Sequence, residues 1–453
     1  MTRVLVVGDV LLDRDLMGRV ERLCPDAPVP VVDQDRVVER PGGAGLAAVL
    51  AAAQGAEVAL LCALAPDDGG HRLRSLLHGA GVEVLDCGLG GTTVEKVRVR
   101  AAGQSLVRID RGTGAVPHRL PERAASAIGS ADVVLVADYG HGLTAHRPVR
   151  DALASSRARG TPSVWDPHPR GSEPVPDTTL VTPNLREAAR FSDAGGADAA
   201  AQLSDHVRCA RALRARWGCA AVAVTLGESG ALLVTGDGAP LVVPVEHPVQ
   251  AGDTCGAGDA FAAATAVALG GGALLSEAVQ AGVQRATEHV ANAMAPLERE
   301  VTAVGSASER SGGTLVATGG CFDLLHPGHV STLERARRLG DRLVVLLNSD
   351  ASVQRLKGPG RPVQDEHDRA AVLRSLSCVD EVVVFDEDTP VEALRRLRPE
   401  VFVKGGDYSA ATLPEAQVLA EWGGEVVTVP FVAGRSTTGL LQRIDGNGAV
   451  HVG

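Results

Sequence analysis

A glycine-rich segment carries the first residues whose types and spacing suit catalysis. Gly256-Ala257-Gly258-Asp259 stands directly before a strongly helical, alanine-rich run. Glycines let backbone N–H groups turn inward at a helix start, where unsatisfied donors and the positive end of the helix dipole stabilise phosphate charge. Asp259, in the first turn, could take the proton from a substrate hydroxyl while those amides hold the transferred phosphoryl group. The alternative is a favourable first-turn acid beside a tight loop.

A longer pattern near residue 320 carries the second candidate site. Residues 318–329 read TGGCFDLLHPGH and lie between a predicted strand and a predicted helix. His326 and His329, three apart and separated by Pro-Gly, can both point at one anion at the helix start. A zinc site is disfavoured because no third ligand lies at metal-like spacing nearby. Histidines that only cap the helix are the other alternative.

These residues must be positioned by strands that alternate with helices. Short runs rich in Val and Leu recur between alanine-rich stretches, at residues 4–7, 133–137, 164–165, 180–181, 221–225 and 231–234. Such near-continuous apolar strands predict a mostly parallel sheet covered on both faces. Segments 28–40 and 92–110 alternate apolar and polar residues instead, which predicts an antiparallel flap attached to that sheet.

A change of composition divides the chain into two α/β domains. After Ala295 the sequence loses its apolar periodicity and gains Ser, Gly and Glu, which predicts a linker. We therefore expect domains at 1–297 and 314–453, joined by a linker at 298–313. The second domain again alternates strands with helices and is expected to be a smaller, Rossmann-like doubly wound sheet. Its strands are expected at 315–317, 343–347, 382–385, 401–403 and 425–429, and its helices at 329–339, 366–377 and 390–397.

The first domain carries the motifs of a known kinase family. Asp9 and Asp13 flank the carboxyl end of the first predicted strand, and Pro41-Gly42-Gly43-Ala44 opens a helix. Thr182-Pro183-Asn184-Leu185-Arg186-Glu187 follows a later strand. Together with the segment that ends at Asp259, and in this order across residues 1–297, these motifs resemble the ribokinase-like (PfkB) sugar kinases.

That resemblance implies a function for each motif. Asp259 would be the catalytic base, and Gly256 and Gly258 would form the anion hole. The sugar would bind near the residues Asp9, Asp13, Gly42, Gly43 and Lys96. ATP and Mg²⁺ would bind near the residues Asn184, Glu187, Thr225 and Gly227, with Glu187 acting on the metal indirectly. For Asn184 and Glu187 the alternative is a helix cap with a first-turn acid.

The second domain resembles the cytidylyltransferase-like nucleotidyltransferases, whose signature reads Gly-x-Phe-Asp-x-x-His-x-Gly-His. The resemblance implies His326, His329 and Lys357 as catalytic residues. Nucleotide-binding residues would be Gly320, Phe322, Arg369, Ser436, Thr437 and Thr438, and substrate-binding residues would be Lys404 and Asp407. Only three of the 44 basic residues are lysines, and two of them, Lys357 and Lys404, fall in these motifs.

The chemistry expected of this second site is charge stabilisation. A sugar phosphate oxygen is already an anionic nucleophile, so its attack on the α-phosphate of ATP requires positioning and neutralisation, with pyrophosphate leaving on Mg²⁺. His326 and His329 would donate to the α- and β-phosphates, and Lys357 would neutralise the growing charge. No general base is required.

Taken together, the two halves resemble the family of bifunctional heptose 7-phosphate kinases and heptose 1-phosphate adenylyltransferases. The resemblance implies two steps towards ADP-heptose. Three residues of the kinase half depart from that family: Leu46 stands where a sugar-contacting Asn is usual, and His141 and His168 stand where Lys is usual. Two alternatives therefore remain open, a kinase and nucleotidyltransferase for other sugar or alcohol phosphates, and a kinase half that serves as a binding and dimerisation scaffold.

Composition excludes several classes of function. The net charge of −11 gives no overall basic field with which to hold nucleic acid or an anionic membrane. The eight cysteines form no Cys-x-x-Cys pair, and the N-terminus has neither a long apolar segment nor a cleavage site, so we expect a cytoplasmic protein with reduced thiols. Exposed flap edges predict a homodimer closed flap to flap.

Overall fold

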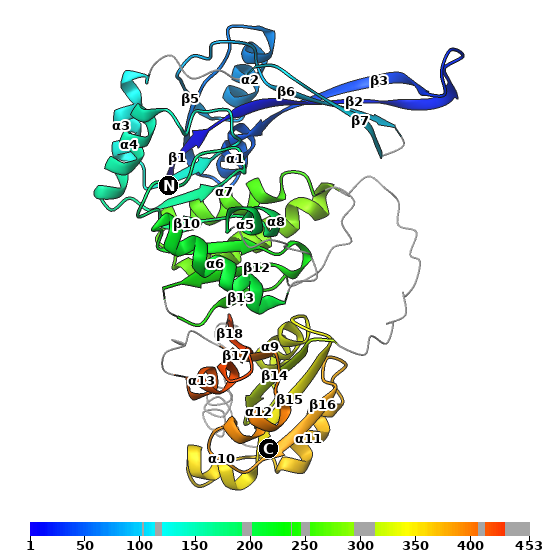
Figure 1. The fold of residues 1–453 in the computed structure, drawn as a ribbon, viewed down its shortest axis with the longest axis vertical. Helices are drawn as coiled ribbons and strands as arrows, with labels where there is room; N and C mark the ends of the chain where they lie inside the picture. Colours follow the sequence, from blue (N-terminus) through cyan, green and yellow to red (C-terminus); the bar gives the residue numbers. More distant parts are fainter. Residues whose placement is uncertain are drawn as a thin grey trace, which may run out of the picture. The chain divides into compact units, whose positions relative to one another are not determined.

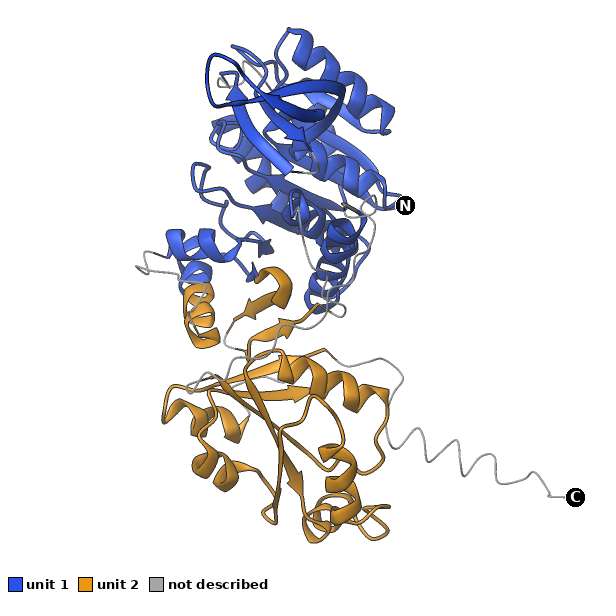
Figure 2. Cartoon of the chain, turned by 90° about the vertical axis from the view of Figure 1, so that its right-hand side faces the viewer, with its two compact units in different colours: residues 1–196, 212–225, 246–297 blue, residues 197–211, 226–245, 298–453 orange. Residues whose placement is uncertain are grey.

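A computed structural model describes residues 1–101, 104–113, 120–192, 202–236, 238–245, 254–293, 313–405 and 413–430. The chain forms two compact units (Figure 2). The first comprises residues 1–196, 212–225 and 246–297, and the second comprises residues 197–211, 226–245 and 298–453. The expected linker lies almost wholly outside the described residues, so the expected domain limits stay a prediction.

The first unit is built on a parallel sheet of strand order β11-β10-β9-β8-β1-β4-β5. Every neighbouring pair runs parallel, as the apolar runs predict. The strands are β1 (Arg3–Gly8), β4 (Glu57–Cys62), β5 (Glu83–Asp86), β8 (Val133–Ala137), β9 (Ser163–Asp166), β10 (Leu180–Val181) and β11 (Ala221–Thr225). Their side chains from Val4 to Val7 and from Val133 to Ala137 are buried, because helices cover the sheet.

Helices α1 and α7 pack against each other and lie over strands β1, β4, β8 and β9. Helix α3 packs against β1 and α4, and α8 packs along α7 (Figure 1). The helices of this unit are α1 (Ala44–Ala52), α2 (Asp68–Gly79), α3 (Glu122–Ser130), α4 (Arg147–Ala158), α5 (Leu185–Phe191), α7 (Ala257–Gly270) and α8 (Leu275–Ala293), and α6 (Leu203–Trp217) begins in the second unit. This packing holds the N-termini of α1 and α7 at the carboxyl ends of the strands.

A second sheet forms the expected flap, which extends from the first unit in Figure 1. Its order is β3-β2-β6-β7, with β2 (Val10–Leu23), β3 (Pro30–Gly43), β6 (Glu95–Ala101) and β7 (Gln104–Arg111). The outer pairs are antiparallel, but the central β2–β6 pair is parallel. The prediction of an antiparallel flap was thus wrong for that pair. The chain passes through β4, α2 and β5 before β6, which therefore runs beside β2 in the same direction.

The second unit contains the order β16-β15-β14-β17-β18-β13-β12. Its strands are β12 (Ala231–Thr235), β13 (Leu241–Val243), β14 (Leu315–Gly320), β15 (Arg342–Asn348), β16 (Glu381–Phe385), β17 (Val401–Gly405) and β18 (Glu425–Val429). All pairs are parallel except β12–β13, a hairpin in which Leu241 of β13 pairs with Thr428 of β18. The hairpin groups with the second unit, although it precedes the expected linker in the sequence.

Five helices among the described residues accompany these strands: α9 (Pro327–Arg337), α10 (Asp350–Lys357), α11 (Glu366–Arg374), α12 (Val391–Leu397) and α13 (Pro414–Ala420). Helices α10 and α13 were not expected, because each is short. The core lies between this sheet and helices α12 and α13, around Phe402, Leu394 and Leu419. In the part of the chain that the structure describes, no helix is long and apolar enough to cross a membrane.

Candidate active sites

Asp259 lies in the first turn of α7, where the sequence places it, and only 7% of its surface is exposed. Gly256 precedes the helix at φ 83°, a left-handed conformation that suits glycine. A Cβ on Gly256 would stand 2.9 Å from both the His289 Nε2 atom and the Leu46 Cδ2 atom. Nothing lies within 4 Å of a Cβ on Gly258. The glycine at 256 is therefore required by conformation and space, and Leu46 contacts the predicted anion hole.

The hydroxyl of Tyr139 donates a hydrogen bond of 2.7 Å to the Asp259 Oδ1 atom. The Lys96 ammonium lies 5.4 Å from the centroid of the same tyrosine ring. Burial raises the pKa of Asp259 to about 7, although the Tyr139 hydrogen bond and the Lys96 charge act in the opposite direction. A carboxylate with this pKa is suited to accept a proton near neutral pH.

Asp9 and Asp13 lie close to this carboxylate but are already bonded. The Asp9 carboxylate accepts hydrogen bonds from the backbone N–H groups of Tyr139, His141 and Leu143, at 3.2, 2.9 and 3.2 Å. Burial raises the pKa of Asp9, against the effect of these donors. The Asp13 carboxylate pairs with Arg98 at 2.6 Å. Asp9 therefore shapes the loop that carries Tyr139.

Gly42 and Gly43 allow the flap to approach these acids closely. A Cβ on Gly42 would lie 2.4 Å from the Asp13 Oδ2 atom. Gly43 has φ 60°, and a Cβ there would lie 2.6 Å from the Asp9 carbonyl oxygen and 3.2 Å from the Tyr139 ring. The structure therefore brings the predicted sugar-binding glycines together with Asp9, Asp13 and the base.

The predicted nucleotide-binding residues Asn184 and Glu187 cap helix α5. The Asn184 Oδ1 atom accepts from the Glu187 backbone at 3.0 Å, and the Glu187 carboxylate accepts from the Asn184 backbone at 2.9 Å. Asn184 also forms a parallel bridge with Thr225, which places both predicted residues at one sheet edge. Gly227, which begins a 3-10 turn (Gly227–Ser229), belongs to the second unit. Burial raises the pKa of Glu187.

In the second unit, His326 and His329 stand at the N-terminus of α9. The His326 Nδ1 atom accepts from the His329 backbone N–H at 3.4 Å, so a neutral His326 carries its proton on Nε2. The two imidazole rings stack with centroids 3.8 Å apart and an angle of 18°. Burial, together with the charges of His326 and Lys357, lowers the pKa of His329 to about 4. His329 is therefore neutral near pH 7.

Phe322 supports this pair of histidines. It has φ 43°, an uncommon conformation for a bulky residue, and its ring centroid lies 5.3 Å from that of His329. A Cβ on Gly320 would lie 3.2 Å from the Phe322 ring, so the glycine gives the ring room. Gly320 and Phe322 thus lie where the nucleotidyltransferase signature predicts, at the end of β14.

Asp323 fixes the loop at residues 361–364. It is 1% exposed and accepts hydrogen bonds from the Arg361 guanidinium at 2.6 Å and from the backbone of Val363 and Gln364 at 2.6 and 3.3 Å. Although burial raises it, the pKa of Asp323 is held below its usual range by these donors. Asp323 therefore holds residues 361–364 against the signature loop.

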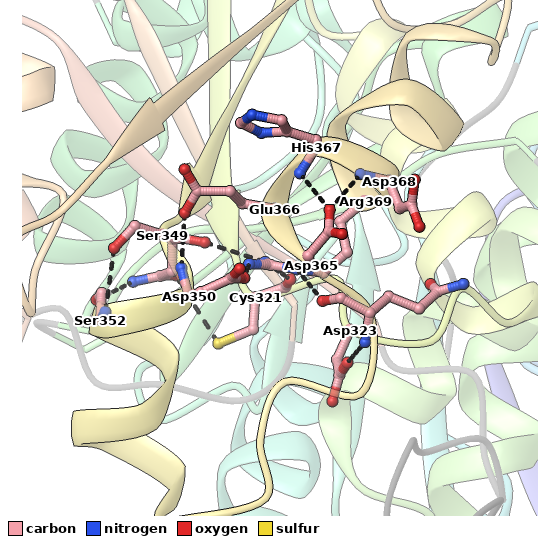
Figure 3. Close-up of polar contacts among 12 residues, drawn as sticks. Cys321, Asp323, Ser349, Asp350, Ser352, Asp365, Glu366, His367, Asp368 and Arg369 are labelled. Carbon is pink, nitrogen blue, oxygen red and sulfur yellow. Dashed lines mark hydrogen bonds and ion pairs between the residues drawn. The ribbon is translucent and has the colours of Figure 1, made fainter.

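Arg369 lies beneath the signature loop (Figure 3). Its side chain is fully buried, donates to the Cys321 and Asn348 carbonyl oxygens at 2.6 and 3.0 Å, and pairs with Asp350 at 2.6 Å. These bonds give Arg369 a positioning function for the loop and for α10. Its direct contact with a nucleotide stays a prediction.

Comparison with known proteins assigns a family to each half of the chain. The pfkB family carbohydrate kinase model matches residues 1–294, and the cytidylyltransferase-like model matches residues 317–445. "Bifunctional protein HldE" of Streptomyces coelicolor is 50% identical, covering 98% of this chain and 96% of the relative. The protein of that name from Caulobacter vibrioides is 38% identical, covering 98% and 96%. The chain belongs to the HldE family.

Solved structures support the fold of the kinase half of this HldE family member. Escherichia coli phosphofructokinase-2 in complex with fructose-6-phosphate matches with a TM-score of 0.52 and 20% identity, covering 64% of this chain and 95% of that chain. Arabidopsis thaliana ribokinase complexed with ribose and ATP matches with a TM-score of 0.50 and 20% identity, covering 64% and 93%. The predicted ribokinase-like fold is therefore confirmed, and the chain is an enzyme with a kinase half and a nucleotidyltransferase half.

The remaining predicted residues differ in what the structure shows. Lys357 ends α10, is exposed, and acts electrostatically on His329. Lys404 pairs with the buried Glu415 at 2.9 Å. Asp407 and the predicted helix start at residues 436–438 lie outside the described residues. Tyr139 was missed as a site residue, and its only sequence signal is that the chain has two tyrosines.

Proposed function

We propose that the protein phosphorylates the anomeric hydroxyl of heptose 7-phosphate with ATP, and transfers AMP from ATP to heptose 1-phosphate with release of pyrophosphate. The observation that carries the proposal is Asp259, a buried carboxylate of pKa about 7 at a helix N-terminus, beside sugar-side residues of the flap. The family membership and the complete signature around His326 and His329 support the second activity.

In the kinase half, Asp259 accepts the proton of the anomeric hydroxyl as the oxygen attacks the γ-phosphate of ATP. Tyr139 holds the carboxylate through Oδ1, which leaves Oδ2 for the substrate hydroxyl. The backbone N–H groups at the start of α7 stabilise the negative charge of the transferred group. ADP leaves, and the sugar carries a new phosphate at its anomeric carbon.

In the nucleotidyltransferase half, the phosphate oxygen of heptose 1-phosphate attacks the α-phosphate of ATP. The Nε2–H group of His326 and a neutral His329 donate hydrogen bonds to phosphate oxygens, and Lys357 stabilises the charge that grows during transfer. The nucleophile is already an anion, so no residue of this unit needs to remove a proton.

The kinase half fits a magnesium–nucleotide complex. Among the residues described, no basic side chain bonds to the half-buried Glu187 carboxylate, and a divalent cation held through water would supply the missing positive charge. Bound Mg²⁺ neutralises phosphate charge and orients the leaving group. Glu187 would orient a water of that ion, and Asn184 would hold Glu187 in place.

We infer a cytoplasmic homodimer from two further features. All eight cysteines are free, as expected in a reducing compartment. The flap exposes a set of apolar side chains that a second flap would cover: Val20, Val37, Val38, Leu106, Val107 and Ile109. Sedimentation of the protein and of a Val107→Asp, Ile109→Asp variant tests the dimer, and a variant that stays dimeric contradicts it.

The proposed activities are tested by product analysis. The protein is incubated with ATP, Mg²⁺ and either heptose 7-phosphate, sedoheptulose 7-phosphate or heptose 1-phosphate, and ADP and pyrophosphate are measured separately. We expect ADP only with heptose 7-phosphate and pyrophosphate only with heptose 1-phosphate. A preference for sedoheptulose 7-phosphate, or pyrophosphate release with none of these sugars, contradicts the proposal.

A further inference from the structure

Basic side chains surround the tyrosine that bonds to Asp259. They come from the flap and from the loops after β8 and β9, and are called here the basic cluster: Lys96, His141, His168 and Arg170. The His168 ring stacks on the Tyr139 ring with centroids 6.1 Å apart and an angle of 20°, and Lys96 lies over the same ring. A Cβ on Gly140 would lie 2.7 Å from the Arg170 Cβ atom and 3.0 Å from the His168 Nδ1 atom. The cluster therefore packs around residues 139–141.

The charged ends of the basic cluster have no acidic partner. Within the described parts of the chain, the Lys96 ammonium, the His141 ring and the Arg170 guanidinium make no hydrogen bond or ion pair. The His168 Nδ1 atom accepts from the Arg170 backbone at 3.2 Å, which leaves Nε2 as its donor. The nearby Arg98 is instead paired with Asp13 at 2.6 Å.

The two acids that act on the basic cluster, Asp9 and Asp138, accept hydrogen bonds from other groups. The Asp9 carboxylate is held by three backbone N–H groups of residues 139–143. The Asp138 carboxylate accepts from the Gly140 and Ser172 backbones at 2.8 Å each and from the Thr144 hydroxyl at 2.6 Å. Asp9 and Asp138 therefore act on the cluster through their charges, but in the described parts of the chain neither carboxylate forms a hydrogen bond or ion pair with a side chain of the cluster.

The two histidines lie in an environment that disfavours their charged form. Burial lowers the pKa of His141, and Arg170 and Lys96 lower it further, against the opposing charges of Asp9 and Asp138. Burial also lowers the pKa of His168, as do Arg170, Lys96 and His141, while Asp138 opposes them. An anion that entered among these groups would reverse the repulsion and favour protonation of both rings.

We propose that the basic cluster binds the non-reacting phosphate group of the kinase's sugar substrate. The inference rests on the proposed function, and it names the residues that recognise a sugar phosphate rather than a free sugar. The order β11-β10-β9-β8-β1 separates the cluster, after β8 and β9 and on the flap, from Asn184 and Thr225 after β10 and β11. The charge of Lys96 influences both Asp259 and His141, and its ammonium lies over the Tyr139 ring that bonds to Asp259. One sugar phosphate could therefore contact both the base and the cluster.

Histidines give this site a pH dependence that lysines would not. A histidine that binds a phosphate dianion takes up a proton. Binding therefore weakens as pH rises, because fewer protons are available in the more alkaline solution. A lysine stays charged through the same range. Affinity for the sugar phosphate is therefore expected to fall on the alkaline side, whereas affinity for the same sugar without its phosphate is not.

The test measures binding of heptose 7-phosphate and of heptose to the full-length protein by calorimetry, without ATP. In the His141→Gln, His168→Gln double variant we expect affinity for heptose 7-phosphate to fall by roughly 10- to 100-fold, with heptose binding unchanged. From about pH 7 to about pH 8.5, where the phosphate is mostly dianionic, wild-type affinity should fall roughly fivefold or more. The His141→Lys, His168→Lys double variant should bind tightly at both pH values.

The controls separate this inference from the proposed function. His71→Gln, which changes an exposed histidine of α2, should bind like wild type. An unchanged preference for the phosphorylated sugar in the double Gln variant overturns the inference, as does a loss confined to ATP affinity. If wild type does not phosphorylate heptose 7-phosphate, the proposed function fails. The cluster is then judged with sedoheptulose 7-phosphate against sedoheptulose, and loss of that preference in the Gln variant supports it.

Discussion

The two proposed reaction centres place a functional side chain at similar positions but give it opposite properties. Asp259 lies in the first turn of α7, and His329 lies in the first turn of α9. Burial favours the uncharged form of each, so that the pKa of Asp259 rises to about 7 while that of His329 falls to about 4. The acid becomes a base that can exchange a proton near neutral pH, whereas the histidine stays a neutral hydrogen-bond donor.

This difference follows from the two nucleophiles. An anomeric hydroxyl is neutral and must lose a proton when it attacks phosphorus, so the kinase needs a base. A sugar phosphate oxygen is anionic and needs only donors and positive charge. The same helix-terminus geometry thus serves two reactions because the residue placed there, and its burial, differ.

The largest expected effect is the loss of kinase activity when Asp259 is replaced. Asp259→Asn keeps the shape of the side chain and is expected to lower ADP formation roughly 100-fold or more, because an amide cannot accept the hydroxyl proton. Pyrophosphate formation should remain at the wild-type rate. Coupled assays of both products measure this, with Asp151→Asn on the surface of α4 as the control. Kinase turnover within a few-fold of wild type would remove Asp259 from the mechanism.

His329→Ala should act on the other reaction alone. Loss of one donor to the developing charge is expected to cost about 3 kcal/mol, or roughly 100-fold in turnover, with a smaller change in ATP affinity. ADP formation should not change. The matched control is His367→Ala, an exposed histidine of the same unit. A His329→Ala protein that releases pyrophosphate at near the full rate shows that the site is misassigned.

Arg369 distinguishes the second site from the first, because its buried ion pair with Asp350 holds the signature loop in place. Arg369→Ala removes the bonds to Asp350 and to two carbonyl oxygens, and should lower the stability of this unit by about 2 to 4 kcal/mol. Hydrogen exchange of β14 and β15 measures the loss. Arg374→Ala, an exposed arginine on the same helix, should have little effect. Equal protection in both variants contradicts the positioning function of Arg369.

The smallest expected effect concerns Tyr139. Tyr139→Phe removes the hydrogen bond that lowers the pKa of Asp259, so the acid limb of the kinase pH profile should move to higher pH. At about pH 8.5, where the carboxylate is again ionised, the rate should recover to within a few-fold of wild type. A limb that does not move, or a loss that is equal at every pH, indicates that Tyr139 acts only through packing.

Local motifs were more predictable than the contacts between them. The segment from Gly256 to Asp259 and the pair His326 and His329 could be read from the sequence because a helix start depends on neighbouring residues. Tyr139 could not, because it lies 120 residues from Asp259 and only the sheet order brings the two together. Arg369 shows a related limit, since its residue type indicates a phosphate ligand but not that its side chain is fully buried. The parallel β2–β6 pair likewise depends on the path of the chain through β4 and β5.

The central claim, that one site uses a base and the other does not, is tested most directly by the pH dependence of both activities in one preparation. Turnover is measured at saturating substrates between about pH 5.5 and about pH 8.5. The kinase rate should fall as pH drops below about 7, because Asp259 becomes protonated, while the pyrophosphate-releasing rate should vary little, because His329 stays neutral. A flat kinase profile, or the same acid limb in both activities, would contradict the account.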